Sequence, residues 1–123
     1  MSPSGPKQRL GRWGEEVAAQ YLLARGYRLL GKNVRTPYGE IDLLFEKDEI
    51  TVFVEVKTRS GTGFGLPEEA VTRAKQEHIL AAIAYYWQHA ERAERDWRVD
   101  VIAVIRPVNG KDIEVEHFEN AIG

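Results

Sequence analysis

Two neighbouring segments, residues 40–45 and 50–57, combine apolar and charged side chains in a way that restricts the fold of this 123-residue chain. Alternation with a period of two is typical of β-strands that bury one face. Both segments also contain large apolar residues such as Ile41 and Phe53, and the charged residues 46–49 between them are a turn signal. The sequence therefore predicts a hairpin whose strands belong to a buried sheet and not to an exposed edge.

The periodicity of the remaining chain predicts two helices and three more strands. Apolar residues recur every three or four positions over residues 8–25 and over residues 67 to about 90, which indicates amphipathic helices. Gly26 is a stop signal for the first helix, and Pro67 is a start signal for the second. Further strands are predicted at 27–34, 97–106 (long and largely buried) and 113–118, with turns at 36–39 and 109–110. The order α-β-β-β-α-β-β predicts an α/β fold with a mixed β-sheet flanked by helices.

The length and the lack of internal repeats predict one domain, residues 8–123, preceded by a flexible tail at residues 1–7. The absence of cysteine excludes a disulfide scaffold, a thiolate metal site and a cysteine nucleophile. The three histidines lack zinc-ligand spacing. No segment approaches the roughly 18 apolar residues of a membrane span, and the N-terminus lacks the apolar region of a signal peptide. We therefore expect a cytoplasmic protein without a membrane partner.

Charge is distributed unevenly along the chain, although the formal net charge is only −2. Residues 1–39 contain seven Lys and Arg against two Glu, whereas residues 76–123 contain five Lys and Arg against nine Asp and Glu. Such an asymmetry can direct one surface toward a polyanion. It is equally compatible with an uneven, solvated surface.

Charged residues of the predicted hairpin converge on one patch. Glu55 and Lys57 are two residues apart in a strand and therefore share a face, opposite Val54 and its apolar neighbours. The partner strand should place its two acids on one face and its apolar residues on the other: Glu40 and Asp42 against Ile41 and Leu43. A hairpin that turns near residues 47–48 sets Asp42 across from Glu55 or diagonal to it.

Clustered carboxylates beside a lysine favour metal-assisted chemistry on phosphates. Carboxylates resist burial together unless a positive group joins them. Mg²⁺ is a suitable partner, because it prefers oxygen ligands and commonly uses one or two carboxylates with substrate phosphate. The metal lowers the pKa of a bound water, and a lysine can orient that water and stabilise charge on the phosphate. These groups suit phosphodiester hydrolysis, although an exposed sheet face with a solvated Glu55–Lys57 pair would show the same pattern.

Asp42, followed thirteen residues later by Glu55-Val56-Lys57, resembles the D…ExK signature of the PD-(D/E)xK nuclease superfamily, which has the restriction-endonuclease-like fold. The likeness is greatest to the YraN-like UPF0102 family of small bacterial proteins, which are similar to archaeal Holliday-junction resolvases. It covers nearly the whole chain and is carried by Gly11, Gly14, Glu15, Ala18, Tyr21, Leu22, Gly26, Tyr27, Asn33, Gly39–Asp42, Phe53–Arg59, Lys75 and Arg98–Val101. The sequence departs from the superfamily pattern at Ile41, where the signature has proline.

The resemblance implies roles for the residues of the acidic cluster. Asp42 and Glu55 would bind Mg²⁺ or Mn²⁺, with the backbone carbonyl of Val56 as a third ligand. Lys57 would be the catalytic lysine. Glu15, on the first helix, would complete the acidic cluster as a catalytic residue and metal ligand.

Residues around this cluster are candidates for supporting roles. Glu40 either contacts the metal ligands without binding the ion or is itself a metal ligand. Five cations are candidate nucleic-acid contacts: Arg12, Arg35, Arg59, Arg73 and Lys75. An ordinary surface cation is the competing interpretation for each, although Lys75 belongs to the matching pattern. The glycine-rich segment 60–65 is predicted to be a flexible loop beside the site.

The expected function is Mg²⁺- or Mn²⁺-dependent hydrolysis of DNA phosphodiester bonds by an endodeoxyribonuclease, at branched or otherwise structured DNA. The alternative is a non-catalytic nucleic-acid-binding or adaptor module that retains the fold. A further alternative is a subunit that cuts only within a complex or a homodimer, because the junction-cleaving relatives act as dimers.

Outside the cluster, His78 is expected to pack in the core. Asp100 is expected to be buried and paired with an arginine.

Overall fold

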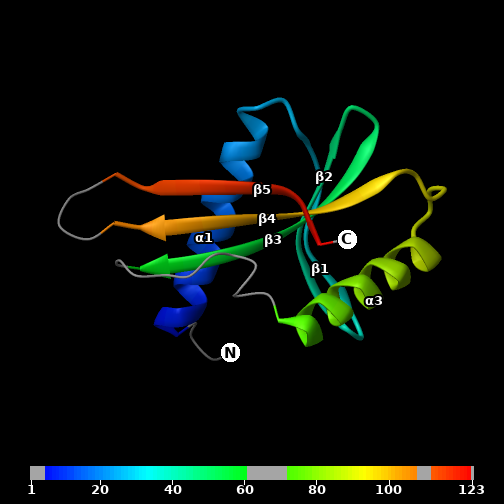
Figure 1. Cartoon of the computed structure of the whole chain (residues 1–123), viewed down its shortest axis with the longest axis horizontal. Helices are drawn as coiled ribbons and strands as arrows, with labels where there is room; N and C mark the ends of the chain where they lie inside the picture. The colour runs from blue at the N-terminus through cyan, green and yellow to red at the C-terminus, as the bar shows by residue number, and fades with distance from the viewer. Residues whose placement is uncertain (1–4, 61–71, 108–111, 123) are drawn as a thin grey trace.

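The computed structural model describes residues 5–60, 72–107 and 112–122, and Figure 1 shows the elements that they form. Along the chain these are α1 (Pro6–Leu23), β1 (Arg28–Thr36), β2 (Gly39–Lys47), β3 (Ile50–Ser60), α3 (Arg73–His89), β4 (Trp97–Arg106) and β5 (Glu114–Ile122). The order α-β-β-β-α-β-β confirms the predicted α/β class. Within the described residues, no helix combines the length and apolar character that a membrane crossing requires.

The five strands form one mixed sheet in the order β1-β2-β3-β4-β5. Neighbouring strands are antiparallel except β3 and β4, which are parallel, with α3 between them in the chain. β4 pairs on both sides and buries every residue from Val99 to Ile105. The prediction of a long buried strand at residues 97–106 is therefore confirmed.

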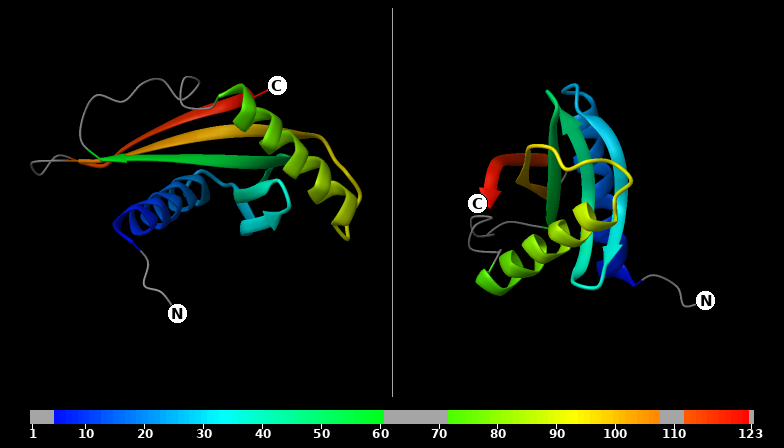
Figure 2. Two further views of the ribbon diagram at one scale, coloured as in Figure 1. Left: turned by 90° about the horizontal axis from the view of Figure 1, so that it is seen from below. Right: turned by 90° about the vertical axis from the view of Figure 1, so that its right-hand side faces the viewer.

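The two helices cover opposite faces of the sheet, as the views in Figure 2 show. α1 packs Ala18 and Leu22 into a core that contains Phe45. α3 packs Ile83 into a second core that contains Phe53. Because side chains of a strand point alternately to the two faces, the central strands contribute to both cores. This arrangement is the mixed sheet flanked by helices that the sequence predicts.

α1 begins earlier than its periodicity predicts. Gly5 is the N-cap and Pro6 the first helical residue, so Pro6 and Lys7 belong to the helix and not to a tail. Proline is favoured there because the first N–H groups of a helix have no partner within it. The helix ends at Leu23, and Gly26, with φ of +85°, allows the chain to turn toward β1.

The prediction of one continuous second helix from residue 67 is wrong at Thr72. This residue has an extended backbone, and its side chain caps α3 by accepting a hydrogen bond from the Lys75 N–H at 3.2 Å. The predicted start at Pro67, most of the predicted loop 60–65 and the turn at 109–110 lie outside the described residues. Ser60 itself is the last residue of β3.

β1, β3 and β5 continue past their predicted ends, to Thr36, Ser60 and Ile122. Backbone pairing with the neighbouring strand extends into these segments, for example Thr36 with Gly39 and Ser60 with Arg106. Apolar alternation cannot detect such extensions, because the pairing depends on the backbone and not on the side chains.

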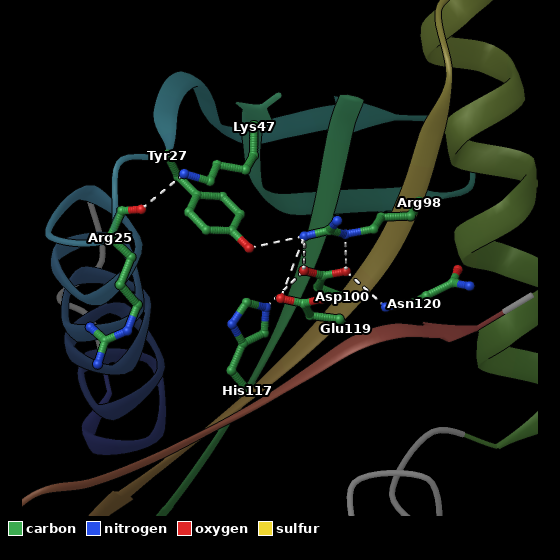
Figure 3. Close-up of polar contacts among 8 residues, drawn as sticks. All are labelled: Arg25, Tyr27, Lys47, Arg98, Asp100, His117, Glu119 and Asn120. Atoms are coloured by element: carbon green, nitrogen blue, oxygen red, sulfur yellow. Dashed lines mark hydrogen bonds and ion pairs between the residues drawn. The ribbon is translucent and has the colours of Figure 1, made fainter. Parts of the chain in front are cut away.

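A buried ion-pair cluster connects β4 to β5 and to the start of β1 (Figure 3). The Asp100 side chain is fully buried; its carboxylate accepts hydrogen bonds from Arg98 Nε and from the Asn120 N–H, each at 2.9 Å, and lies 2.7 Å from His117 Nε2. Arg98 also donates to the Tyr27 hydroxyl at 2.9 Å. Burial acts to raise the pKa of Asp100, but its hydrogen bonds outweigh burial and hold that pKa below its usual value. The predicted burial and arginine pairing of Asp100 are confirmed.

Candidate active site

The candidate site lies where β2 and β3 separate. The two strands pair from Lys47 and Ile50, next to the hairpin turn, as far as Leu43 and Val54. Beyond that point the first residues of β2 pair with β1, whereas the rest of β3 pairs with β4 (Figure 1). Asp42 is the residue at which the separation begins, and we call this region the strand fork.

At the strand fork, the Asp42 side chain takes the place of the backbone carbonyl that would accept a hydrogen bond from β3 in a continuous ladder. Its Oδ2 accepts a hydrogen bond from the Val56 N–H at 2.8 Å. The predicted alternation of β2 is wrong at this point, because Ile41 packs in the core beside α3 whereas Leu43 packs in the core beside α1. Regular alternation would place both residues on one face. The side chains of β2 therefore change faces between Ile41 and Leu43, and the Asp42 carboxylate is directed toward β3.

Asp42 and Glu55 form a carboxylate pair, as the predicted hairpin register requires. Burial, and after it the charge of Glu55, raise the pKa of Asp42 to about 8. Burial also raises the pKa of Glu55, although Lys57 and a hydrogen bond with Asp42 act in the opposite direction. Two acids in this position cannot both be charged at neutral pH without added positive charge. A bound proton or an added cation would relieve the repulsion within the pair.

Lys57 and Lys75 place positive charge next to the carboxylate pair. Lys57 Nζ lies 3.7 Å from Glu55 Oε1, which confirms the predicted shared face. Lys75, in the first turn of α3, lies within interaction distance of Lys57, and the proximity of the Lys57 ammonium lowers the pKa of Lys75 because two positive charges repel. Arg59 repels Lys75 more weakly. The end of β3 and the start of α3 thus form one cationic region.

α1 brings Glu15 to the same region because the helix approaches β3 very closely at Gly14. A Cβ atom at Gly14 would stand 1.9 Å from Thr58 Oγ1, so only glycine permits this approach. Glu15 Oε1 accepts a hydrogen bond from Asn33 Nδ2 at 2.9 Å, and the charge of Glu15 contributes to the raised pKa of Asp42. Glu15 is thus near the Asp42–Glu55 pair, and its hydrogen bond with Asn33 of β1 holds it there.

The sequence reasoning assigned no role to Gly14 or Asn33, although each carries a signal. Glycine inside an amphipathic helix lowers helix stability, so its presence there indicates close packing or function. Asn33 has φ of +50°, a left-handed conformation that asparagine tolerates better than most residues. An isolated asparagine in a strand segment is therefore a signal for an irregular backbone, where the side-chain amide can donate a hydrogen bond to another element.

The oxygen donors at the strand fork suit a hard divalent cation that uses few protein ligands. Across residues 5–60, 72–107 and 112–122, no three His, Asp or Glu side chains are grouped so that they could hold a metal ion. Mg²⁺ needs fewer, because it binds through one or two carboxylates and keeps several waters. Asp42 and Glu55 supply these carboxylates. The Val56 carbonyl lies on the side of β3 that faces Asp42, since the N–H and C=O of a strand residue point the same way.

Two predicted phosphate-binding residues, Arg12 and Arg35, line a surface groove beside Glu15. Glu40 lines the same groove, and its Oε2 lies 3.9 Å from Arg35 Nε. Glu40 is exposed, and it also lines the groove on the α3 side, where Glu55 and Lys75 are found. Its position is therefore between the two grooves, at the exposed start of β2.

Two residues of α3 lie on its exposed surface. Arg73, a predicted nucleic-acid contact, is exposed and its Nε lies 4.0 Å from Glu77 Oε1 on the same helix. The prediction that His78 packs in the core is wrong, because His78 is exposed. The helix instead turns Ile79 and Ile83 toward the sheet, and His78 lines the groove on the α3 side.

Comparison with known proteins identifies the family. The model of "Uncharacterised protein family UPF0102" matches residues 14–104, a segment that includes all of the site residues from Glu15 to Lys75. A UPF0102 protein of Syntrophotalea carbinolica is 47% identical over 112 residues, covering 91% of this chain and 89% of the relative. Relatives from Syntrophomonas wolfei and Thermus thermophilus, also UPF0102 proteins, are 45% and 43% identical, over 93% and 88% of this chain and 97% and 92% of their own lengths. The chain therefore belongs to the UPF0102 family.

Proposed function

We propose that this protein is a metal-dependent nuclease that hydrolyses DNA phosphodiester bonds, with a site of the PD-(D/E)xK type on a restriction-endonuclease-like fold. The observation that carries the proposal is the partly buried Asp42–Glu55 pair with Lys57 Nζ 3.7 Å from Glu55. Paired acids with raised pKa values, together with a lysine and further cations at the rim, suit a divalent cation and an anionic substrate.

Asp42, Glu55 and the Val56 carbonyl are the groups that would hold Mg²⁺ or Mn²⁺, and Glu15 adds negative charge beside them. When bound, the ion supplies Lewis acidity toward the phosphate and lowers the pKa of a bound water. Asn33 fixes the direction of the Glu15 carboxylate through their 2.9 Å hydrogen bond.

Lys57 is the group that would contact the reacting phosphate or orient the attacking water. Its attraction to Glu55 keeps the ammonium group at the strand fork. Lys75 lies beside Lys57 and provides a second cation for the same phosphate or its neighbour. Arg12 and Arg35 line the groove on the α1 side and would bind phosphates farther along the strand. Positive charge thus flanks the acidic pair on both sides.

The decisive experiment is cleavage of labelled single-stranded, duplex, flap and four-way-junction DNA in Mg²⁺, Mn²⁺ or EDTA. Glu55→Gln and Lys57→Met remove one charge each with little change in volume. Glu116→Gln is the matched control, because Glu116 is exposed on β5 and faces Ala103 of β4 across the ladder. We expect metal-dependent cutting by the wild type and the control, and a loss of at least 100-fold in both site variants.

Other outcomes separate the alternatives. Salt-sensitive DNA binding by a wild type that cuts none of the substrates would identify a non-catalytic nucleic-acid-binding module. Cutting that appears only at concentrations where the chain self-associates, measured by sedimentation, would identify the homodimer as the active form.

A further inference from the structure

A half-exposed aromatic ring forms one wall of the groove on the α3 side of the site. Tyr38 is 52% exposed and lies in the turn between β1 and β2. The groove that it lines extends to Glu55 and Lys75, and Ile79 and Ala82 of α3 contribute its apolar lining. A large aromatic surface therefore remains in solvent within the groove that contains an acid of the candidate site.

The turn holds Tyr38 in a defined position. The Tyr38 N–H donates to Thr36 Oγ1 at 3.1 Å, and the same hydroxyl donates to the Gly39 carbonyl at 2.6 Å. The ring packs edge to face against Tyr85 of α3, with centroids 6.5 Å apart, and Tyr85 stacks on His89 at 4.0 Å. This support restricts the ring before any ligand arrives, which lowers the entropic cost of binding.

The groove combines charged and apolar side chains, which fits a nucleotide better than a wholly apolar ligand. Lys75 lines its α3 wall and, with the adjacent Lys57, provides positive charge for a phosphate beside the acids Glu40 and Glu55 of the same groove. His78 lines the same groove. The aromatic wall that Tyr38 forms, together with the apolar lining of the groove, suits the flat face of a base.

We propose that this groove binds an unpaired DNA nucleotide, with its base on the face of Tyr38 and its phosphate beside Lys75. The base must be unpaired because both faces of a base within a duplex are covered by its stacking neighbours. The groove would thereby recognise an unpaired nucleotide next to the scissile bond. This inference rests on the proposed nuclease function, and it selects DNA with an unpaired segment at the cleavage position as the substrate class.

Binding in EDTA tests the nucleotide site without cleavage. The DNA is a duplex with a five-nucleotide single-stranded tail, compared with the same duplex without the tail, and 2-aminopurine in the tail reports stacking by loss of fluorescence. Tyr38→Leu removes the aromatic face, Tyr38→Phe retains it, and Leu80→Ala is a control at another exposed apolar residue, on α3. Thermal unfolding of each variant verifies that it is folded.

We expect the wild type to bind the tailed duplex at least 10-fold more tightly than the blunt one and to quench the tail fluorescence. Tyr38→Leu should bind the tailed duplex about 10-fold more weakly and should no longer quench the fluorescence of the tail. Its binding to the blunt duplex should be unchanged. Tyr38→Phe and Leu80→Ala should resemble the wild type. Equal affinity of the wild type for both duplexes, or an unchanged preference in Tyr38→Leu, would overturn the inference.

Failure of this inference can be distinguished from failure of the nuclease proposal. Preference for the tailed duplex that depends on Tyr38, without any metal-dependent cleavage, supports the nucleotide site and overturns the nuclease. Cleavage that depends on Glu55 but keeps the same position and substrate preference in Tyr38→Leu supports the nuclease and overturns the nucleotide site.

Discussion

Replacing Asp42 by asparagine should make the metal-free protein more stable at alkaline pH. The amide oxygen of the introduced side chain can still accept the hydrogen bond that the Val56 N–H donates at 2.8 Å. The amide has the size and neutrality of a protonated aspartic acid, and it leaves Glu55 without a charged neighbour at this position. The substitution therefore removes the titration of this carboxyl while retaining the contact that closes the strand fork.

The magnitude follows from the raised pKa of Asp42. The folded value of about 8 lies well above the ordinary value of 3.8, so between about pH 4 and pH 8 the folded chain holds a proton that the unfolded chain has lost. Stability contributed by this proton is fully present below about pH 4 and is lost as the pH rises through about 8. A gap of about 4 pKa units corresponds to about 6 kcal/mol, at roughly 1.4 kcal/mol for each unit.

Urea unfolding in EDTA at intervals from pH 5 to pH 9 measures this effect. The free energy of unfolding of the wild type should fall by several kcal/mol more than that of Asp42→Asn, and Mg²⁺ or Mn²⁺ should restore the wild type alone at high pH. The control Glu116→Gln should follow the wild type, because this exposed residue lies outside the site. Parallel pH curves for the wild type and Asp42→Asn would refute the reasoning, since they would mean that Asp42 titrates like an ordinary exposed acid.

Three further substitutions test other parts of the structure. Gly14→Ala should lower the free energy of unfolding by about 1–3 kcal/mol in urea, because its Cβ would overlap Thr58 Oγ1. Its control Gly11→Ala, in the same helix but with open space around it, should raise that free energy by about 0.5–1 kcal/mol. Asp100→Asn should cost about 3 kcal/mol at pH 7 by the same measurement, because it leaves the buried side of Arg98 without its counter-charge. This cost should shrink as the pH falls through the lowered pKa of Asp100, where the wild type loses the same charge. Lys75→Gln should weaken DNA binding in anisotropy titrations and reduce the slope of log K against log salt by about 1.

Local sequence patterns predict those parts of the site that lie within one hairpin. A turn at residues 48–49 fixes the register, and the two-residue period places Glu55 and Lys57 on one face. The same logic explains why the bounds of β4 and the burial of Asp100 could be predicted, because a long apolar run with one acid requires a buried partner for that acid.

Contacts between distant segments could not be predicted in this way. The approach of Glu15 depends on Gly14 meeting Thr58, two residues that are 44 positions apart. The exposure of His78 depends on which face of α3 meets the sheet, and its helical periodicity leaves His78 and Ile79 as alternatives at the border of the apolar stripe. Periodicity describes one element, whereas these positions are decided by the packing of two.

At the strand fork, the separation of β2 from β3 and the proposed chemistry meet at Asp42. Once β2 leaves β3, the Val56 N–H loses a strand partner, and a buried donor without an acceptor costs about 1–3 kcal/mol. Asp42 supplies the acceptor, but asparagine could do so without a carboxylate charge. Placing an acid there, beside the partly buried Glu55, destabilises the metal-free fold at neutral pH. A hydrogen-bond requirement alone therefore does not explain the acid pair, whereas the cation of the proposed metal site would.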